Sequence, residues 1–137
     1  MSSANLDIVR SIYAAWERGD FSSAEWADPE IEFAINEELA EGSWRGPAGM
    51  AEGFRAFLSA WEGFRLTADE YRELDDNRVL VFSHFSGHGK TSGMALDEMR
   101  AGGTELFHLR GGKVTRLAIY ADRERALADA GLSELTN

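Results

Sequence analysis

The sequence predicts one α+β domain, in which a strongly bent, mainly antiparallel sheet forms a cone-shaped barrel and helices pack over its concave face. Two amphipathic helical patterns lie in the first half of the chain, separated by a short strand pattern. From residue 65 onward, apolar residues recur with the two-residue period of β-strands. The 137 residues, 44% of them hydrophobic, suit a single domain over residues 1–137.

The first half of the chain supplies the helices. Residues 5–18 predict the first helix, because their apolar residues recur close to a 3.6-residue period, and a shorter helix is expected over residues 21–26. Residues 31–36 alternate as a half-buried strand, and an acidic loop follows. Residues 46–64 then predict the longest helix, with an apolar stripe formed by Met50, Phe54, Phe57, Leu58 and Trp61.

The second half supplies the sheet. Strands are expected over residues 65–74, 78–90, 96–109 with a break at 101–103, and 114–122. Turn sequences at residues 75–77 and 110–113 join the first pair and the last pair. Four strands in series predict an antiparallel meander, and residues 123–132 suit a final helical turn or two.

Composition and charge exclude several classes of function. The 24 acidic residues against 14 basic ones, a net charge of −10, would repel nucleic acids and anionic membranes. The sequence has no cysteine, so no disulfide and no thiolate metal site can form. No apolar run approaches the ~20 residues of a membrane span, and no signal peptide is recognised at the start. We therefore expect a cytoplasmic protein that uses no metal and no cofactor.

Four segments carry a resemblance to a known family: DIVRSIYAAWERGDFSSAEW near the start, DPEIEF, WRGPAGMAEGFRAFLSAW, and LRGGKVTRLAIYADRERALADAGL at the end. In this order they resemble the SnoaL-like, ketosteroid-isomerase-like branch of the nuclear transport factor 2-like superfamily. The resemblance implies a cone-shaped α+β barrel with a deep pocket, and dimerisation through the outer face of the sheet. It implies no single activity, because the superfamily includes isomerases, cyclases, dehydratases and binding modules.

The catalytic residues of two related enzyme types are incomplete here. A ketosteroid isomerase needs a tyrosine donor, a carboxylate base and a protonated acid. By resemblance these positions fall on Ile12, Phe33 and Glu105, so that only the acid is present and that mechanism is not supported. The histidine and aspartate positions of SnoaL-type cyclases fall on Glu105 and Ile119, so the cyclase pair is broken as well.

Strand parity independently selects Glu105. It shares one strand face with Phe107 and Leu109, opposite Leu117 and Ile119, and this face points into the cone. Burial there would raise the pKa of the carboxyl group and suit a hydrogen-bond donor or a general acid-base. The alternative is that Glu105 lies solvated at the strand edge. If it is buried for function, its replacement by Leu should maintain or raise stability.

Parity also divides the strand over residues 78–90. Val79, Val81, Ser83 and Phe85 match the interior of the cone, whereas Phe82, His84, Ser86 and His88 match its outer face. An exposed apolar and neutral sheet face is a pairing surface, so we expect a homodimer through it.

The predicted pocket is mostly apolar and suits a small apolar or ring-containing molecule. Its expected lining is Phe33, Trp44, Phe54, Leu58, Trp61, Tyr71, Phe85, Phe107 and Ile119. Each aromatic residue taken alone also suits an ordinary core. Two functions remain open. One is a small-molecule-binding module, and the other is a cofactor-independent acid-base enzyme of the isomerase, cyclase or dehydratase type that uses Glu105 as its catalytic residue.

Overall fold

The structure is a computed structural model that describes residues 4–20, 25–35, 42–59, 61–89, 102–120, 126–128 and 131. Its helices and strands, in chain order, are α1 (Ala4–Glu17), β1 (Ala27–Ile35), β2 (Gly42–Arg45), α3 (Gly46–Leu58), β3 (Trp61–Asp75), β4 (Arg78–Gly89), β5 (Gly102–Arg110) and β6 (Lys113–Tyr120).

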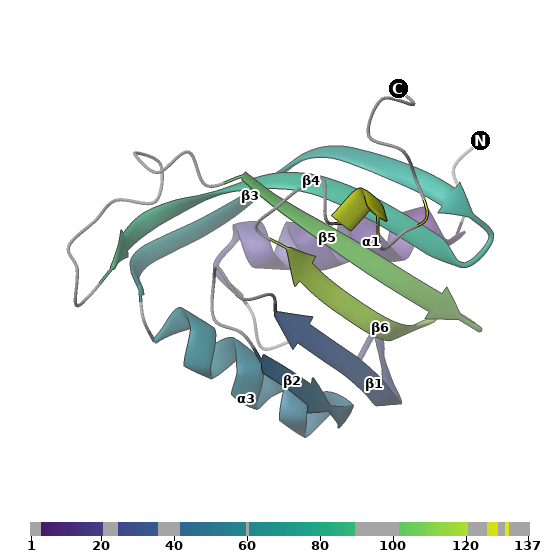
Figure 1. Cartoon of the computed structure of the whole chain (residues 1–137), viewed down its shortest axis with the longest axis horizontal. Coiled ribbons are helices and arrows are strands. Elements are labelled where there is room, and N and C mark those ends of the chain that lie inside the picture. Colours follow the sequence, from purple (N-terminus) through teal and green to yellow (C-terminus); the bar gives the residue numbers. More distant parts are fainter. Residues whose placement is uncertain are drawn as a thin grey trace.

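The strands form one six-stranded sheet in the order β2-β1-β6-β5-β4-β3 (Figure 1). β3 to β6 make the predicted antiparallel meander, and β1 joins it by pairing in parallel with β6. β2 pairs antiparallel with β1 at one edge, while β3 forms the other edge, so the sheet does not close into a barrel. The α+β class and the bent, mainly antiparallel sheet are confirmed.

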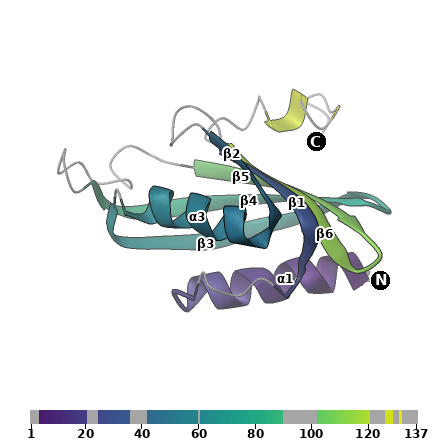
Figure 2. The ribbon, with the colours of Figure 1, turned by 90° about the horizontal axis from the view of Figure 1, so that it is seen from below.

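The two faces of the sheet are covered differently. Figure 2 shows α1 on one side of the sheet and the short C-terminal turn, in yellow, on the other. α3 packs against β1 and β2 so closely that a methyl group on Gly53 would lie 2.7 Å from the Trp44 ring and 2.9 Å from the Phe33 ring. Glycine at position 53 therefore sets the distance between helix and sheet.

Each face has its own apolar cluster. The inner cluster, between the sheet and the helices, consists of buried side chains from α1, α3 and all strands but β2: Val9, Ile12, Tyr13, Trp16, Ala27, Ile31, Phe33, Ile35, Met50, Phe54, Leu66, Val79, Val81, Phe107, Leu109, Val114, Leu117 and Ile119. The outer cluster consists of Leu80, Phe82, Leu106, Ala118, Tyr120, Ala126 and Leu127. The outer face is thus partly covered by the C-terminal turn.

Some predicted boundaries were wrong. The expected loop before α3 contains the strand β2, where Trp44 is the only large apolar residue of four, too few to show an alternating pattern. The long helix ends at Leu58, and Trp61 begins β3. The predicted helix was too long because the helical spacing of apolar residues continues by chance into the strand. The short helix expected at 21–26 falls largely on residues outside the described part, as does most of the segment between β4 and β5.

In the described residues, no helix combines the length and the apolar character that crossing a membrane requires.

Candidate functional site: a buried carboxyl group

Glu105 lies in the middle of β5, with Val81 of β4 on one side and Ile119 of β6 on the other. Only 1% of its surface is exposed. The inward orientation predicted from strand parity is confirmed, and the alternative of a solvated strand edge is wrong. A carboxyl group at this depth is costly unless hydrogen bonds compensate for its lost hydration.

Two hydroxyl groups supply such hydrogen bonds. The Tyr13 hydroxyl of α1 donates to Oε1 of Glu105, and the Ser83 hydroxyl of β4 donates to Oε2 over 2.8 Å. Tyr13 reaches the carboxyl group because it belongs to the buried stripe of α1, and Ser83 because it alternates inward two residues after Val81. Each carboxyl oxygen therefore has one hydroxyl partner, from two different elements.

Burial dominates the electrostatics of this site. It raises the pKa of Glu105 from 4.5 to about 7, although the hydrogen bonds from Tyr13 and Ser83 act in the opposite direction. Burial, and then the negative charge of Glu105, raise the pKa of Tyr13 well above 10.0. Near neutral pH, Glu105 is thus present in both protonation states while Tyr13 remains a neutral donor.

Aromatic rings surround the Tyr13 side chain. Its ring makes edge contacts with Trp16, Tyr71 and Phe107, at centroid distances of 4.8, 5.7 and 5.9 Å. Tyr71 is only partly buried, and the Arg10 guanidinium lies 5.6 Å from its ring centroid. These contacts fix the Tyr13 ring and so hold its hydroxyl at the carboxyl group.

The residues predicted to line a pocket lie in two neighbouring groups. Phe107 and Ile119 are close to Glu105 in the sheet, and Tyr71 contacts Tyr13. Phe33, Phe54 and Trp44 form the other group, with centroid distances of 4.6 Å for Phe33 to Phe54 and 5.7 Å for Phe33 to Trp44.

The Trp16 ring links the two groups. Trp16 lies 5.6 Å from Phe54 and 6.3 Å from Phe107, measured between centroids. Leu58 packs, partly buried, against the same inner cluster. Trp61 and Phe85 lie on β3 and β4, and their side chains are outside the described part.

Sequence reasoning missed Tyr13 as a partner of Glu105. The tyrosine position was placed on Ile12, which is buried in the inner cluster, whereas the next residue, Tyr13, supplies the hydroxyl. The spacing of Val9, Tyr13 and Trp16 along one helical stripe could have indicated it. Phe33, at the expected base position, is fully buried among apolar side chains, so no carboxylate base stands there.

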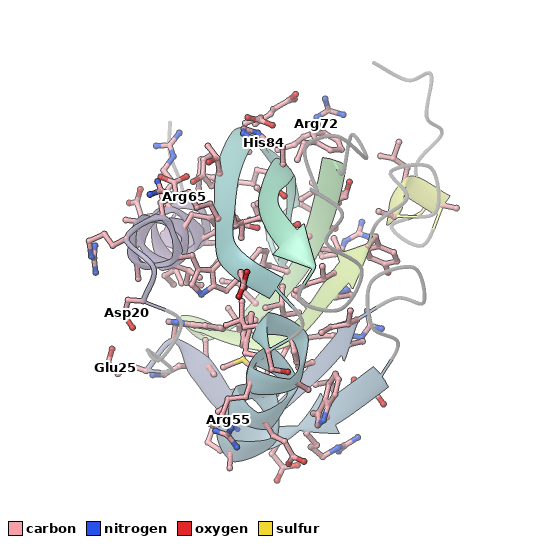
Figure 3. All side chains as sticks on the ribbon, turned by 90° about the vertical axis from the view of Figure 1, so that its left-hand side faces the viewer. Asp20, Glu25, Arg55, Arg65, Arg72 and His84 are labelled. Atoms are coloured by element: carbon pink, nitrogen blue, oxygen red, sulfur yellow. The ribbon has the colours of Figure 1, made fainter. Side chains whose placement is uncertain are left out.

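A metal ion would require a group of ligand side chains. Among the described residues, no group of three or more His, Cys, Asp or Glu side chains could hold an ion. His84 pairs instead with Asp69, its Nδ1 atom lying 3.0 Å from a carboxylate oxygen, and Figure 3 shows His84 and Arg72 far from Arg55 of α3.

Solved structures of other proteins have the same fold, and two of those described below were crystallised with a small molecule. TerC, co-crystallised with polyporic acid, has 23% identity and a TM-score of 0.72, with 95% of this chain and 98% of that one covered. An NTF2-like protein from Burkholderia thailandensis has 20% identity and a TM-score of 0.74, covering 87% and 90%. A Catenulispora acidiphila protein with a ketosteroid isomerase-like fold, in complex with trimethylamine, has 17% identity and a TM-score of 0.65, covering 92% and 93%.

Identities below 25% establish the fold and leave the activity open. No curated protein sequence matches the chain. The family model of the SnoaL-like domain, by contrast, matches residues 9–117, which include most of α1, Glu105 and most of the sheet. The chain therefore belongs to the SnoaL-like domain family.

Proposed function

We propose that the concave side of the sheet binds a small, mostly apolar, ring-containing molecule, and that Glu105 with Tyr13 holds an oxygen atom of this ligand. The observation that carries the proposal is the buried carboxyl group with its hydroxyl partners, at the centre of an otherwise apolar cluster. An apolar site with a few converging polar groups is the usual form of a small-molecule site.

The protonation chemistry supports an oxygen-bearing ligand. A protonated Glu105 can donate to a carbonyl oxygen, and an ionised Glu105 can accept from a hydroxyl group. Tyr13 remains a neutral donor in either case because its pKa lies well above 10.0. TerC was co-crystallised with polyporic acid and the Catenulispora acidiphila protein is in complex with trimethylamine, which supports small-molecule binding on this fold.

A second candidate function, acid-base catalysis, is favoured by the pKa of about 7 for Glu105. A general base is most effective when its pKa lies near the working pH. An ionised Glu105 would take a proton from the carbon next to a carbonyl group, and the electron pair would move to the carbonyl oxygen. The Tyr13 hydroxyl would stabilise this enolate until the carboxylic acid returns the proton to carbon.

Binding is tested with 2-naphthol and, as a control without a hydroxyl donor, 2-methoxynaphthalene. We expect 2-naphthol to bind saturably and more tightly than 2-methoxynaphthalene, because only 2-naphthol has a hydroxyl group that can donate a hydrogen bond to Glu105. Glu105→Leu should remove this preference, whereas Thr104→Val, a buried neighbour on the opposite face, should keep it. Equal binding of the two compounds to the unaltered protein would refute the assignment of the oxygen to Glu105.

Catalysis is tested separately, by following deuterium exchange into 2-tetralone in heavy water by NMR. Glu105→Gln can still donate a hydrogen bond but cannot take up a proton. If the protein is an enzyme of this type, exchange requires the carboxyl group and falls to the solvent rate in the variant. If the protein is only a binder, the unaltered protein and the variant give the same slow exchange.

We also propose a homodimer through the outer face of the sheet, supported by the exposed side chain of His84 on β4. Phe82, expected on the same surface, is 3% exposed because it belongs to the outer cluster, which includes Ala126 and Leu127 of the C-terminal turn. The Phe82 side chain is therefore not part of the proposed dimer contact surface. Sedimentation at micromolar concentration tests the proposal, and a species of 15.2 kDa alone would refute it.

A further inference from the structure

A cavity lies at the opposite end of the sheet from β3, on strands β1, β2 and β6. It measures about 280 Å³ and is lined by Glu32, Phe33, Ala34, Ser43, Trp44, Arg45 and Arg116. Strand parity places Glu32 and Ala34 on the outer face, because Ile31, Phe33 and Ile35 belong to the inner cluster. The charged part of this cavity is thus separated by the sheet from Glu105.

Two arginines share one carboxylate in this cavity. In the sheet, Glu32 lies between Arg45 of β2 and Arg116 of β6. Nη2 of Arg45 is 2.8 Å from Oε2 of Glu32, and Nε of Arg116 is 3.8 Å from Oε1. The three side chains therefore carry one net positive charge, in a protein whose net charge is −10.

The ion pairs here are weak enough to rearrange. The side chains of Arg45, Arg116 and Glu32 are 67%, 39% and 51% exposed, and exposed pairs contribute only about 0–1 kcal/mol. An incoming anion can therefore engage both guanidinium groups without a large loss of stability. Two arginines also offer planar donor groups that match the geometry of a carboxylate.

The row of basic side chains continues along the sheet, where Arg78 pairs with Asp75. Arg116 lies opposite His108 of β5, which lies opposite Arg78 of β4. Burial, followed by the charges of Arg116 and Arg78, lowers the pKa of His108, so this ring is neutral near neutral pH. Two residues further along the strands, Ala34 of β1 lies beside Ala118 of β6, and both pack with the apolar outer cluster.

We propose that this cavity binds a small monocarboxylate with an apolar body, its carboxylate held between Arg45 and Arg116. With a bound monoanion the local charges balance, because the two arginines then face two negative groups, Glu32 and the ligand carboxylate. A phosphate dianion would leave an excess negative charge beside Glu32. Ser43, another lining residue, has a hydroxyl group as a further donor, and Ala34, opposite Ser43 in the sheet, suits an apolar body.

The test uses benzoate, the neutral benzamide and the dianion phenyl phosphate, read by NMR at the backbone and side-chain N–H signals of Arg45 and Arg116. We expect saturable shifts with benzoate and at least tenfold weaker binding of benzamide and phenyl phosphate. Reading the signals at this cavity separates the result from any binding near Glu105. Equal affinity for benzoate and benzamide, or no saturable shift up to high millimolar benzoate, would overturn the proposal.

Matched variants test the role of the two arginines. Arg116→Gln and Arg45→Gln should each weaken benzoate about tenfold, equivalent to about 1.4 kcal/mol. Arg55→Gln removes the same charge from an exposed position on α3, outside the cavity lining, and should leave the affinity within about twofold (Figure 3). An equal loss in Arg55→Gln would mean that only net charge matters, and the proposed site would be wrong. Unfolding temperatures of the variants check that each is folded.

Discussion

Replacing Glu105 with Gln should remove the pH dependence that the buried carboxyl group gives to the free energy of unfolding. In the folded protein the carboxyl group keeps its proton up to a pKa of about 7, whereas the ordinary value is 4.5. Between these pH values the unfolded chain gives up its proton and the folded chain does not. The unfolded state therefore binds fewer protons, and the free energy of unfolding falls as the pH rises through this window.

The magnitude follows from the two pKa values. The difference between 4.5 and about 7 corresponds to about 3 kcal/mol, at 1.36 kcal/mol for each pKa unit. This contribution is fully present below pH 4.5 and is lost above about pH 8. The loss is a large part of the ~5–15 kcal/mol by which a domain is usually stable.

Urea unfolding at a series of pH values from 4.5 to 8.5 measures this effect. Subtracting the Glu105→Gln curve from the unaltered one cancels the contributions of the other titrating groups. We expect the difference to change by about 3 kcal/mol, with its midpoint between the two pKa values. Thr104→Val, a buried substitution that removes no titratable group, is the control and should give a flat difference. Parallel curves for Glu105→Gln and the unaltered protein would show that burial does not raise the pKa of Glu105.

Three further substitutions, one of them with a matched control, test the contact at Glu105 and the packing on both faces of the sheet. Tyr13→Phe removes a hydrogen bond that lowers the pKa of the buried carboxyl group, so carbon NMR titration should give a higher pKa, with a stability loss of about 1 kcal/mol; an unchanged pKa would contradict the contact. Gly53→Ala should cost about 1–3 kcal/mol by urea unfolding because its methyl group overlaps two rings, whereas Gly49→Ala, with a nearest atom at 3.3 Å, should be close to neutral. Leu127→Ala should cost about 2–5 kcal/mol if the C-terminal turn belongs to the outer cluster, and a loss below about 0.5 kcal/mol would show that it does not.

Local sequence pattern was enough to orient the strands of the meander. Alternation alone placed Glu105, Val81 and Ser83 on the inner face, because a strand side chain has only two possible directions. The turn at residues 110–113 was also readable, since Gly111 and Gly112 adopt φ values of 58° and 81° that favour glycine. These features depend on a few consecutive residues.

Features that depend on distant residues were not predictable in the same way. Tyr13 and Glu105 are 92 positions apart, and only the packing of α1 on the sheet brings the hydroxyl to the carboxyl group. This contact also reverses one expectation. Glu105→Leu would leave the buried hydroxyls of Tyr13 and Ser83 without their acceptor, at about 1–3 kcal/mol each, so at acidic pH we now expect a loss of stability.

The outer face was misjudged for a similar reason. Phe82 has the parity of an exposed residue, but it packs in the same cluster as Leu127, 45 positions later, and the Arg72 guanidinium lies 5.0 Å from its ring centroid. The cavity at Glu32 likewise depends on the pairing of β1 with β2 and β6. Because sequence analysis missed β2, it could not place Arg45 beside Glu32.

The most direct test of the proposed function is a carbon NMR titration of the Glu105 carboxyl group, with and without saturating 2-naphthol. We expect a midpoint at about pH 7 in the free protein, because burial raises the pKa, and a displaced midpoint in the complex, because the ligand oxygen contacts the carboxyl group. A midpoint near 4.5, or one that is the same with and without 2-naphthol, would contradict this expectation.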